Sequence, residues 1–259
     1  MSLFLKAITQ IFSNWKMAIR VSLPLAVVLA FIMATGSSIF QDFDPTNLQI
    51  FSIQNTAIIL LSSVIFWVFS CSTAVAWHRY ILLGEQPHGF VIVGKRDRIL
   101  PYLIGTLIVT LFSILVALIL TFGFGILGSI FVGVLPSEIG LVLSLLVSLI
   151  GGAIFYTFIL ALSVSLPGIA MDNPLGIQGA IDATVPYYSK IFVVMLLIQA
   201  CNVVLGVIPS VLIAGQSSIT DISFILITIV NVIFYWFSAM LGIGILTVIY
   251  GFAVEGRDV

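Results

Sequence analysis

Residues 100–134 read "LPYLIGTLIVTLFSILVALILTFGFGILGSIFVGV", a run of about 35 residues without a single Asp, Glu, Lys or Arg. A helix needs about 20 apolar residues to cross a hydrocarbon core of about 30 Å, so this run is more than long enough. As one straight helix it would measure about 50 Å. The sequence therefore predicts a membrane span that bends, tilts or projects beyond the bilayer.

Five further runs have the length of a membrane span, and apart from Arg20 they also lack charged side chains. An unpaired backbone group in hydrocarbon costs several kcal/mol, so we expect all six runs to be helices. The predicted spans lie near residues 19–40, 54–77, 100–134, 140–166, 191–215 and 222–252. This pattern indicates an all-α, polytopic integral membrane protein with six transmembrane helices in a single domain.

The composition supports a lipid environment. Of the 259 residues, 61% are hydrophobic and 7% are charged, whereas soluble domains carry about 25% charged residues. The formal net charge of -1 provides no basic field that would attract nucleic acid. The segments show none of the strict alternation expected of outer-membrane β-strands.

The distribution of charge predicts the orientation. With six spans both termini lie on one side, and all nine basic residues fall on that side, in its loops and tails or, for Arg20, at the very start of the first span. The opposite loops contain Asp42, Asp44, Glu138 and Asp221 and no cation. By the positive-inside rule we expect both termini in the cytoplasm.

Residues 3–18 are predicted to form an interfacial amphipathic helix. Apolar side chains, among them Phe4, Ile8 and Trp15, share one helical face, while Lys6 and Gln10 lie opposite. A secretory signal peptide is the alternative interpretation, because a charged start precedes an apolar run.

The sequence provides little support for metal binding or disulfides. Cys71 and Cys201 lie within apolar runs, and His78 and His88 have no partner at a zinc-ligand spacing. We therefore expect no cofactor and no metal.

The segment "WHRYILLGE", residues 77–85, introduces charge at the end of the second span. Its Trp, Arg and Tyr side chains are typical of a helix leaving the bilayer, with the guanidinium among lipid phosphates. His78 has the intrinsic pKa of a general base, but only Glu85 is near it in sequence, so we predict no catalytic residue. The expected contacts with lipid headgroups or a partner are Trp15, His78, Arg79, Lys95, Arg96 and Arg98.

Glycines gather in the third and fourth spans. Residues 123–128 spell "GFGILG", but the dinucleotide-binding interpretation fails because no strand precedes this motif. Close helix packing or a kink explains the glycines better. The expected partner-contact surface includes Gly123, Gly125, Gly128, Gly151 and Gly152.

Three amides lie within the predicted spans: Gln199, Asn202 and Asn231. Such groups usually hydrogen-bond between helices, for about 1 kcal/mol each. They are also the possible intramembrane polar site of a carrier, and Pro24 and Pro209 would kink or break their helices as transporter helices often do.

The segment between the fourth and fifth spans is predicted to turn at Pro174 and then form a short amphipathic helix. Its apolar face consists of Ile177, Ala180, Ile181 and Val185. We expect this face to lie on the membrane or against the other inner loop.

A weak internal repeat is visible at the inner ends of three spans. Residues 168–173 read "GIAMDN" and residues 251–256 read "GFAVEG", at a shift of 83, and residues 80–85 match less well at a shift of 88. If these matches are structural, the chain consists of three hairpins with the same elbow.

The stretches "WHRYILLGEQP", "ILPYL" and "LSVSLPGIAMDNPLGIQGAIDAT" give the chain a family resemblance. It resembles six-helix bacterial inner-membrane proteins related to the membrane domain of glycerophosphoryl diester phosphodiesterases and to YciC-type proteins. In those phosphodiesterases a separate soluble domain is catalytic, so the resemblance implies a membrane fold in the bacterial inner membrane and transfers no catalytic residue.

We therefore expect a non-enzymatic scaffold or accessory subunit that contacts membrane lipids, packs against another membrane protein or organises lipid. The alternative is a transporter or carrier for a small or amphipathic molecule. An enzyme is the third class, and would require His78 in a cleft with Glu85 and a hydroxyl nucleophile.

Overall fold

A computed structural model of the chain describes residues 3–41, 53–87, 96–200 and 221–256. These residues are almost entirely helical and include no β-strand. Six helical stretches are long and apolar enough to cross a membrane, which confirms the predicted all-α polytopic fold.

The elements follow one another as a series of long helices with short helices at their junctions. They are α1 (Leu3–Ser13), α2 (Trp15–Gln41), α3 (Ile53–Leu83), α5 (Arg96–Val134), α6 (Ser137–Ser163), α7 (Ser165–Ala170), α8 (Ile177–Thr184), the 3-10 helix η2 (Val185–Tyr187), a helix over residues 188–200, and α10 (Asp221–Ala253).

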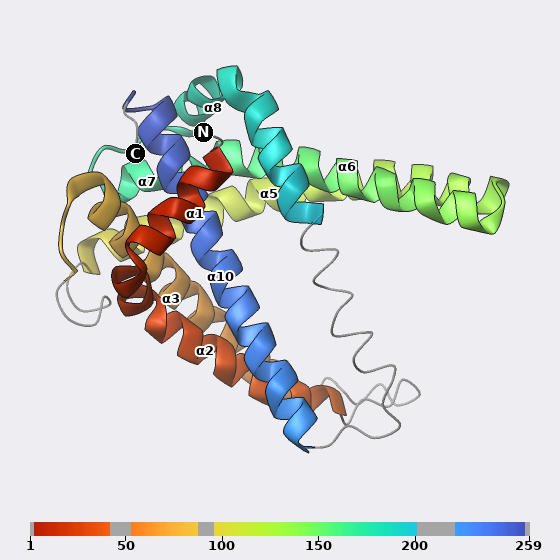
Figure 1. Ribbon diagram of the computed structural model, residues 1–259, viewed down its shortest axis with the longest axis horizontal. Coiled ribbons are helices and arrows are strands. Elements are labelled where there is room, and N and C mark those ends of the chain that lie inside the picture. Colours follow the sequence, from red (N-terminus) through yellow and green to blue (C-terminus); the bar gives the residue numbers. More distant parts are fainter. Residues whose placement is uncertain (1–2, 42–52, 88–95, 201–220, 257–259) are drawn as a thin grey trace.

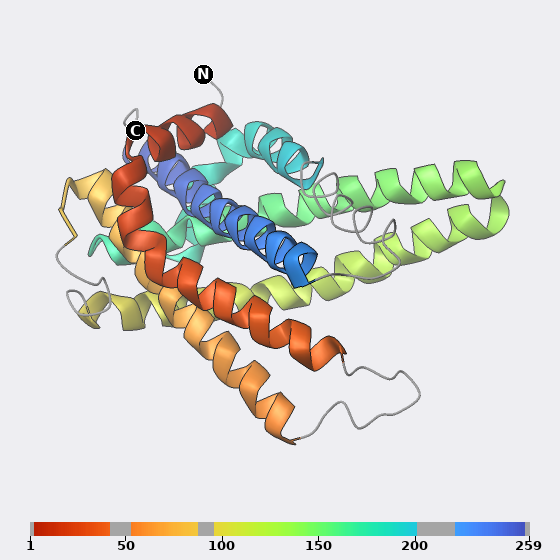
Figure 2. The same cartoon turned by 60° about the horizontal axis from the view of Figure 1, so that its bottom comes forward.

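Two helical hairpins diverge from a common end of the molecule (Figure 1). One consists of α2 and α3, with α10 packed against both, and the other consists of α5 and α6. The short helices α7 and α8 lie at the common end, near both chain termini (Figure 2). We refer to this end as the junction.

The best-packed part of the protein lies at the junction. Its larger core cluster includes Trp77 of α3, Ile191, and Met240 and Tyr250 of α10, all fully buried. A smaller cluster joins α3, α5, α6 and α7 around Tyr102. Apolar side chains on the outer faces of the long helices remain exposed, as lipid-facing side chains do.

The N-terminal helix is shorter than predicted. The expected interfacial helix at residues 3–18 ends at Ser13, and α2 begins at Trp15. The amide of Asn14 donates to the Gln10 carbonyl at 2.9 Å, while its oxygen accepts a hydrogen bond from the Tyr80 hydroxyl at 2.8 Å. These bonds fix the bend between the two helices.

One face of α1 lies on protein instead of on lipid. Leu3, Ala7 and Ile11 are buried, and Gly244 of α10 provides the space for Ile11. Phe12 and Trp15 remain exposed. The predicted amphipathic helix therefore covers the junction end of α10 with its apolar face.

The long third span is one continuous helix. At 39 residues, α5 is about 58 Å long, which exceeds the hydrocarbon thickness. It does not end at its glycines, and α2 likewise continues through Pro24. Pro209 lies outside the described residues.

The connecting segment between the fourth and fifth spans forms α8 as predicted. Ala180 is fully buried, and Ile177 and Ile181 pack against the smaller core cluster. Val185 is exposed, since the chain changes to the 3-10 helix η2 at that residue.

The elbows of the predicted repeat share a backbone feature. Gly84 has a φ of 69° and Asp172 a φ of 67°, at positions that match at a shift of 88. Gly256 has a φ of 64°, one residue later than a shift of 83 predicts. Each of these residues follows the end of a helix, where a left-handed residue is a common terminator.

Candidate functional site

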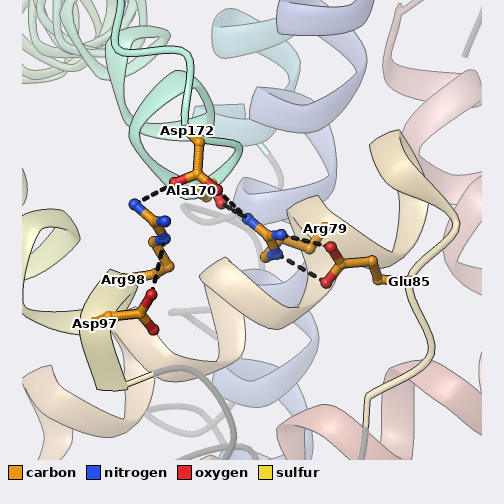
Figure 3. A network of polar contacts seen from close by, with 6 residues as sticks. All are labelled: Arg79, Glu85, Asp97, Arg98, Ala170 and Asp172. Carbon is orange, nitrogen blue, oxygen red and sulfur yellow. Dashed lines mark hydrogen bonds and ion pairs between the residues drawn. The ribbon is translucent and has the colours of Figure 1, made fainter.

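The most extensive polar cluster of the described chain is centred on Arg79, in the last turns of α3 (Figure 3). Its side chain is 9% exposed. The guanidinium binds Glu85 through two parallel hydrogen bonds, from Nε at 2.9 Å and from Nη2 at 2.5 Å. This bidentate geometry is the strongest arrangement available to an arginine and a carboxylate.

The same guanidinium also reaches the second elbow. Its Nη1 donates to the Ala170 carbonyl at 2.6 Å and to Asp172 Oδ2 at 3.3 Å. The Ala170 carbonyl belongs to the end of α7, where cationic groups satisfy unpaired carbonyls. Arg79 therefore joins the elbow after α3 to the elbow after α7.

Asp172 receives a second arginine from α5. Arg98 Nη1 forms an ion pair with Asp172 Oδ1, and Arg98 Nε contacts Asp97 Oδ2 at 3.2 Å. A left-handed conformation costs a non-glycine residue roughly 1–2 kcal/mol. Here that conformation places the carboxylate between two guanidinium groups, whose attraction offsets the cost. We call Arg79, Glu85, Asp172 and Arg98 the elbow network.

The elbow network corrects part of the sequence interpretation. Arg79 was expected among lipid headgroups, but Glu85, Ala170 and Asp172 occupy its donors. Arg98 is partly exposed and also ion-paired. Trp15 is exposed, so its contact with headgroups or a partner stays a prediction. Lys95 and the side chain of Arg96 lie outside the described part of the chain.

His78 was expected at the same interface and is instead 0% exposed. Its Nδ1 lies 2.8 Å from Thr247 Oγ1 of α10, and its Nε2 lies 3.1 Å from the Tyr102 hydroxyl of α5. The neighbouring Trp77, expected in the interfacial belt, is also fully buried. Both side chains belong to the protein core, so neither contacts headgroups directly.

The bonds that Thr247 makes favour one tautomer of His78. Thr247 Oγ1 donates its proton to the Ile243 carbonyl at 2.8 Å, so toward His78 it can only accept. The imidazole is then protonated on Nδ1, and Nε2 accepts from Tyr102. The hydrogen bonds run in one direction, from Tyr102 through His78 and Thr247 to Ile243.

This arrangement differs from the one that catalysis by His78 would require. Glu85 is engaged by Arg79, and His78 is fully buried and does not face an open cleft. A buried imidazole with both nitrogens occupied holds helices together. Among the described residues, no group of three or more His, Cys, Asp or Glu is placed to bind a metal. Cys71 is a buried free thiol, and Cys201 lies outside the described ranges.

Sequence reasoning named only part of these clusters. Tyr102, Thr247 and Asp172 were not selected, although Tyr102 lies in the "ILPYL" motif and Asp172 in a repeated elbow. The repeat was the signal that could have identified Asp172. Thr247 lies in an apolar span and had no signal of its own.

The predicted intramembrane amides are only partly described. Gln199 packs over Gly152, because a Cβ on that glycine would lie 2.6 Å from the Gln199 Nε2. Asn231 lies partly buried on α10. Asn202 lies outside the described residues, so the polar path of a carrier stays a prediction.

The hairpin glycines provide close approach at some positions and not at others. A Cβ on Gly151 would lie 2.8 Å from the Phe124 ring, and one on Gly128 would lie 3.2 Å from Ser144 Oγ. At Gly123 and Gly125 a Cβ would meet nothing within 4 Å. Between the two helices lies a cavity of about 530 Å³, bordered by Gly125, Gly128 and other mostly small side chains.

Two further hollows lie beside α10. The first, which we call the α6–α10 cavity, has a volume of about 410 Å³ and an almost entirely apolar lining. The second, the lysine groove, has a volume of about 460 Å³ and contains Lys6, Ser189 and Lys190. Phe4 of α1 lines both, so the two hollows are adjacent.

Comparisons with known proteins leave the family open. No family model, curated protein or solved structure matches the chain. The resemblance to six-helix bacterial membrane proteins therefore stays a prediction.

Proposed function

We propose that this membrane protein is a non-enzymatic scaffold or accessory subunit that packs against another membrane protein through its α5–α6 hairpin. In this proposal the chain lies in the bacterial inner membrane, with both termini in the cytoplasm. The basic residues at the inner rim, apart from the buried Arg79, contact lipid headgroups or the partner.

The burial of α5 is the observation that carries the proposal. Only 6% of its most apolar stretch is buried, against 22% to 39% in the other five spans. The described part of the hairpin outside the junction is packed mainly against its own partner helix, which Figures 1 and 2 show from two directions.

Glycine on the exposed hairpin favours a protein neighbour over lipid alone. Small residues let helix backbones approach closely, and they are enriched where membrane helices associate. Gly123 has open space beside it and does not border the cavity between α5 and α6, although glycine weakens a helix by about 1 kcal/mol relative to alanine. Contact with a second membrane protein would offset that cost.

Site-specific photocrosslinking in native membranes tests the proposal. A photoreactive amino acid at Phe122, which is 75% exposed, is expected to give one discrete protein adduct. The matched control is Leu60 of α3, which is 62% exposed and lies on the other hairpin. Only lipid adducts at Phe122, or the same protein adduct from both positions, would contradict docking through this hairpin.

A carrier is the second candidate, and the α6–α10 cavity favours it. The apolar lining suits an amphipathic molecule more than an ion, and neither Gln199 nor Asn231 borders this cavity. Gentle detergent extraction separates the candidates. Elution with a stoichiometric partner supports the accessory subunit, whereas a monodisperse single species that exchanges an amphipathic substrate supports the carrier.

A further inference from the structure

The α6–α10 cavity and the lysine groove together have the chemical pattern of an amphiphile. The cavity is bordered by Tyr156 and Leu160 of α6, Met195, and Phe237, Gly242 and Leu246 of α10. The groove adds two ammonium groups and a hydroxyl at one end of this apolar space. Both volumes fall within the range of small-molecule sites.

The two hollows meet at Phe4, which lines both, and together they form a path that leads from the junction toward the middle of the spans. On α10 the groove contains Phe252, nearest the junction, and the cavity extends from Leu246 to Phe234. On the helix over residues 188–200 the groove contains Ser189, Lys190, Val193, Val194 and Leu197, and the cavity contains Met195 and Ile198 on another face of the same helix. The charged end therefore lies at the junction and the apolar end deeper in the spans.

The length of the apolar part corresponds to one leaflet. Twelve residues separate Leu246 from Phe234, which is about 18 Å of helix at 1.5 Å per residue. Half of a hydrocarbon core of about 30 Å is about 15 Å. An acyl chain that enters beside the junction fits this depth.

The lysines indicate an anionic headgroup. Lys6 comes from α1 and Lys190 from the start of the fifth span, and both line the groove. The ammonium of Lys190 also lies 5.8 Å from the centroid of the Tyr187 ring, which holds the cation at the interface. Lysine binds phosphate as a point charge, and Ser189 can donate a further hydrogen bond.

We infer that this path is a binding site for one phospholipid, with its phosphate at Lys6 and Lys190 and an acyl chain in the α6–α10 cavity. The site is separate from the exposed hairpin proposed to dock a protein and does not depend on that proposal. It distinguishes one bound lipid from the surrounding annular lipids, because α6, α10 and the helix over residues 188–200 all border its chain.

The test uses the full-length protein in nanodiscs with phosphatidylglycerol that carries a diazirine on its acyl chain. We expect labelling of peptides that contain Tyr156 or Met195. A diacylglycerol probe with the same chains and no phosphate is the comparison. Diacylglycerol should bind about 30-fold more weakly than phosphatidylglycerol, because it has no phosphate to attract the two lysines, each of which contributes about 1 kcal/mol.

Two pairs of variants separate the apolar and the charged parts of the site. A Cβ on Gly242 meets nothing within 4 Å, so Gly242→Leu should fill the cavity without a clash and abolish this labelling by both probes. Gly242→Ala should retain it, and Gly123→Leu is the matched control on α5. The double variant Lys6→Gln/Lys190→Gln should weaken phosphatidylglycerol about 30-fold and leave diacylglycerol unchanged, whereas Lys16→Gln should change neither.

Unchanged size-exclusion profiles show that the variants are folded. Should Gly242→Leu fail to fold, the lysine variants and the two probes still show whether the site binds a phospholipid through its phosphate. Any of three results would overturn the inference. They are full labelling of the cavity in Gly242→Leu, equal binding of the two lipids, and labelling confined to exposed α5.

Discussion

At the scale of single residues, the buried guanidinium of Arg79 determines how the elbows after α3 and α7 are held. It satisfies two carboxylates and one carbonyl, and each of these groups would lose a charged donor without it. Arg98 contributes to the same network from a more exposed position, where water can replace it. The two arginines should therefore differ in their effect on stability.

Replacing Arg79 with alanine should lower stability by about 3 kcal/mol, at the lower end of the range for a broken buried pair, because both carboxylates are about 40% exposed. Arg98→Ala should cost about 1 kcal/mol or less. Thermal unfolding in detergent, followed by loss of the monodisperse peak, measures both. Equal losses of stability in the two variants would show that the burial of Arg79 does not strengthen its ion pairs.

At the scale of elements, the glycines of the α5–α6 hairpin fall into two classes. Gly140 lies near the tip, where a Cβ would lie 2.5 Å from the Phe131 carbonyl oxygen. Backbone cannot move aside as a side chain can. Gly123 has nothing within 4 Å, so a methyl group there meets no obstacle.

Gly140→Ala should therefore destabilise the hairpin by about 1–3 kcal/mol through overpacking. Gly123→Ala should stabilise it by up to about 1 kcal/mol, because alanine has the higher helix propensity. Hydrogen exchange at the amides of α5 and α6 measures both changes locally. Loss of protection in Gly123→Ala would show that this glycine serves a contact within the chain.

The elements were more predictable than the contacts between them. Long charge-free runs predict helical spans, because hydrocarbon admits only helices and closed barrels, and six such helices are found. Of the predicted fifth span, 191–215, residues 201–215 lie outside the described residues. The buried state of His78 was not predictable, since the same "WHRY" pattern fits both a helix end among headgroups and a helix end covered by protein. His78 is held in the core partly by Thr247, which is 169 residues away in sequence.

At the scale of the whole molecule, the helices converge at the junction and their other ends diverge (Figures 1 and 2). Both termini lie at the junction, together with the elbow network and the lysine groove. If the basic residues follow the positive-inside rule, the junction faces the cytoplasm. The hairpin tip near Glu138 then faces the opposite side.

Cysteine labelling in intact cells tests this orientation, after replacement of Cys71 and Cys201. A cysteine at Asp44 should react with a membrane-impermeant maleimide from outside. A cysteine at Arg96 should react only after the membrane is permeabilised. The reverse labelling pattern would show that the topology is inverted, with the same fold.

The hydrogen bonds from Tyr102 through His78 and Thr247 have a geometric consequence for the whole bundle. A helix places successive side chains about 100° apart, so rotation of α10 by one residue would turn the Thr247 hydroxyl away from the imidazole. The Nδ1 proton would then face hydrocarbon side chains, at a cost of several kcal/mol. Thr247 thus fixes the rotational register of α10 against α3, and Trp236, whose Nε1 donates to Ser22 Oγ at 2.7 Å, fixes it against α2.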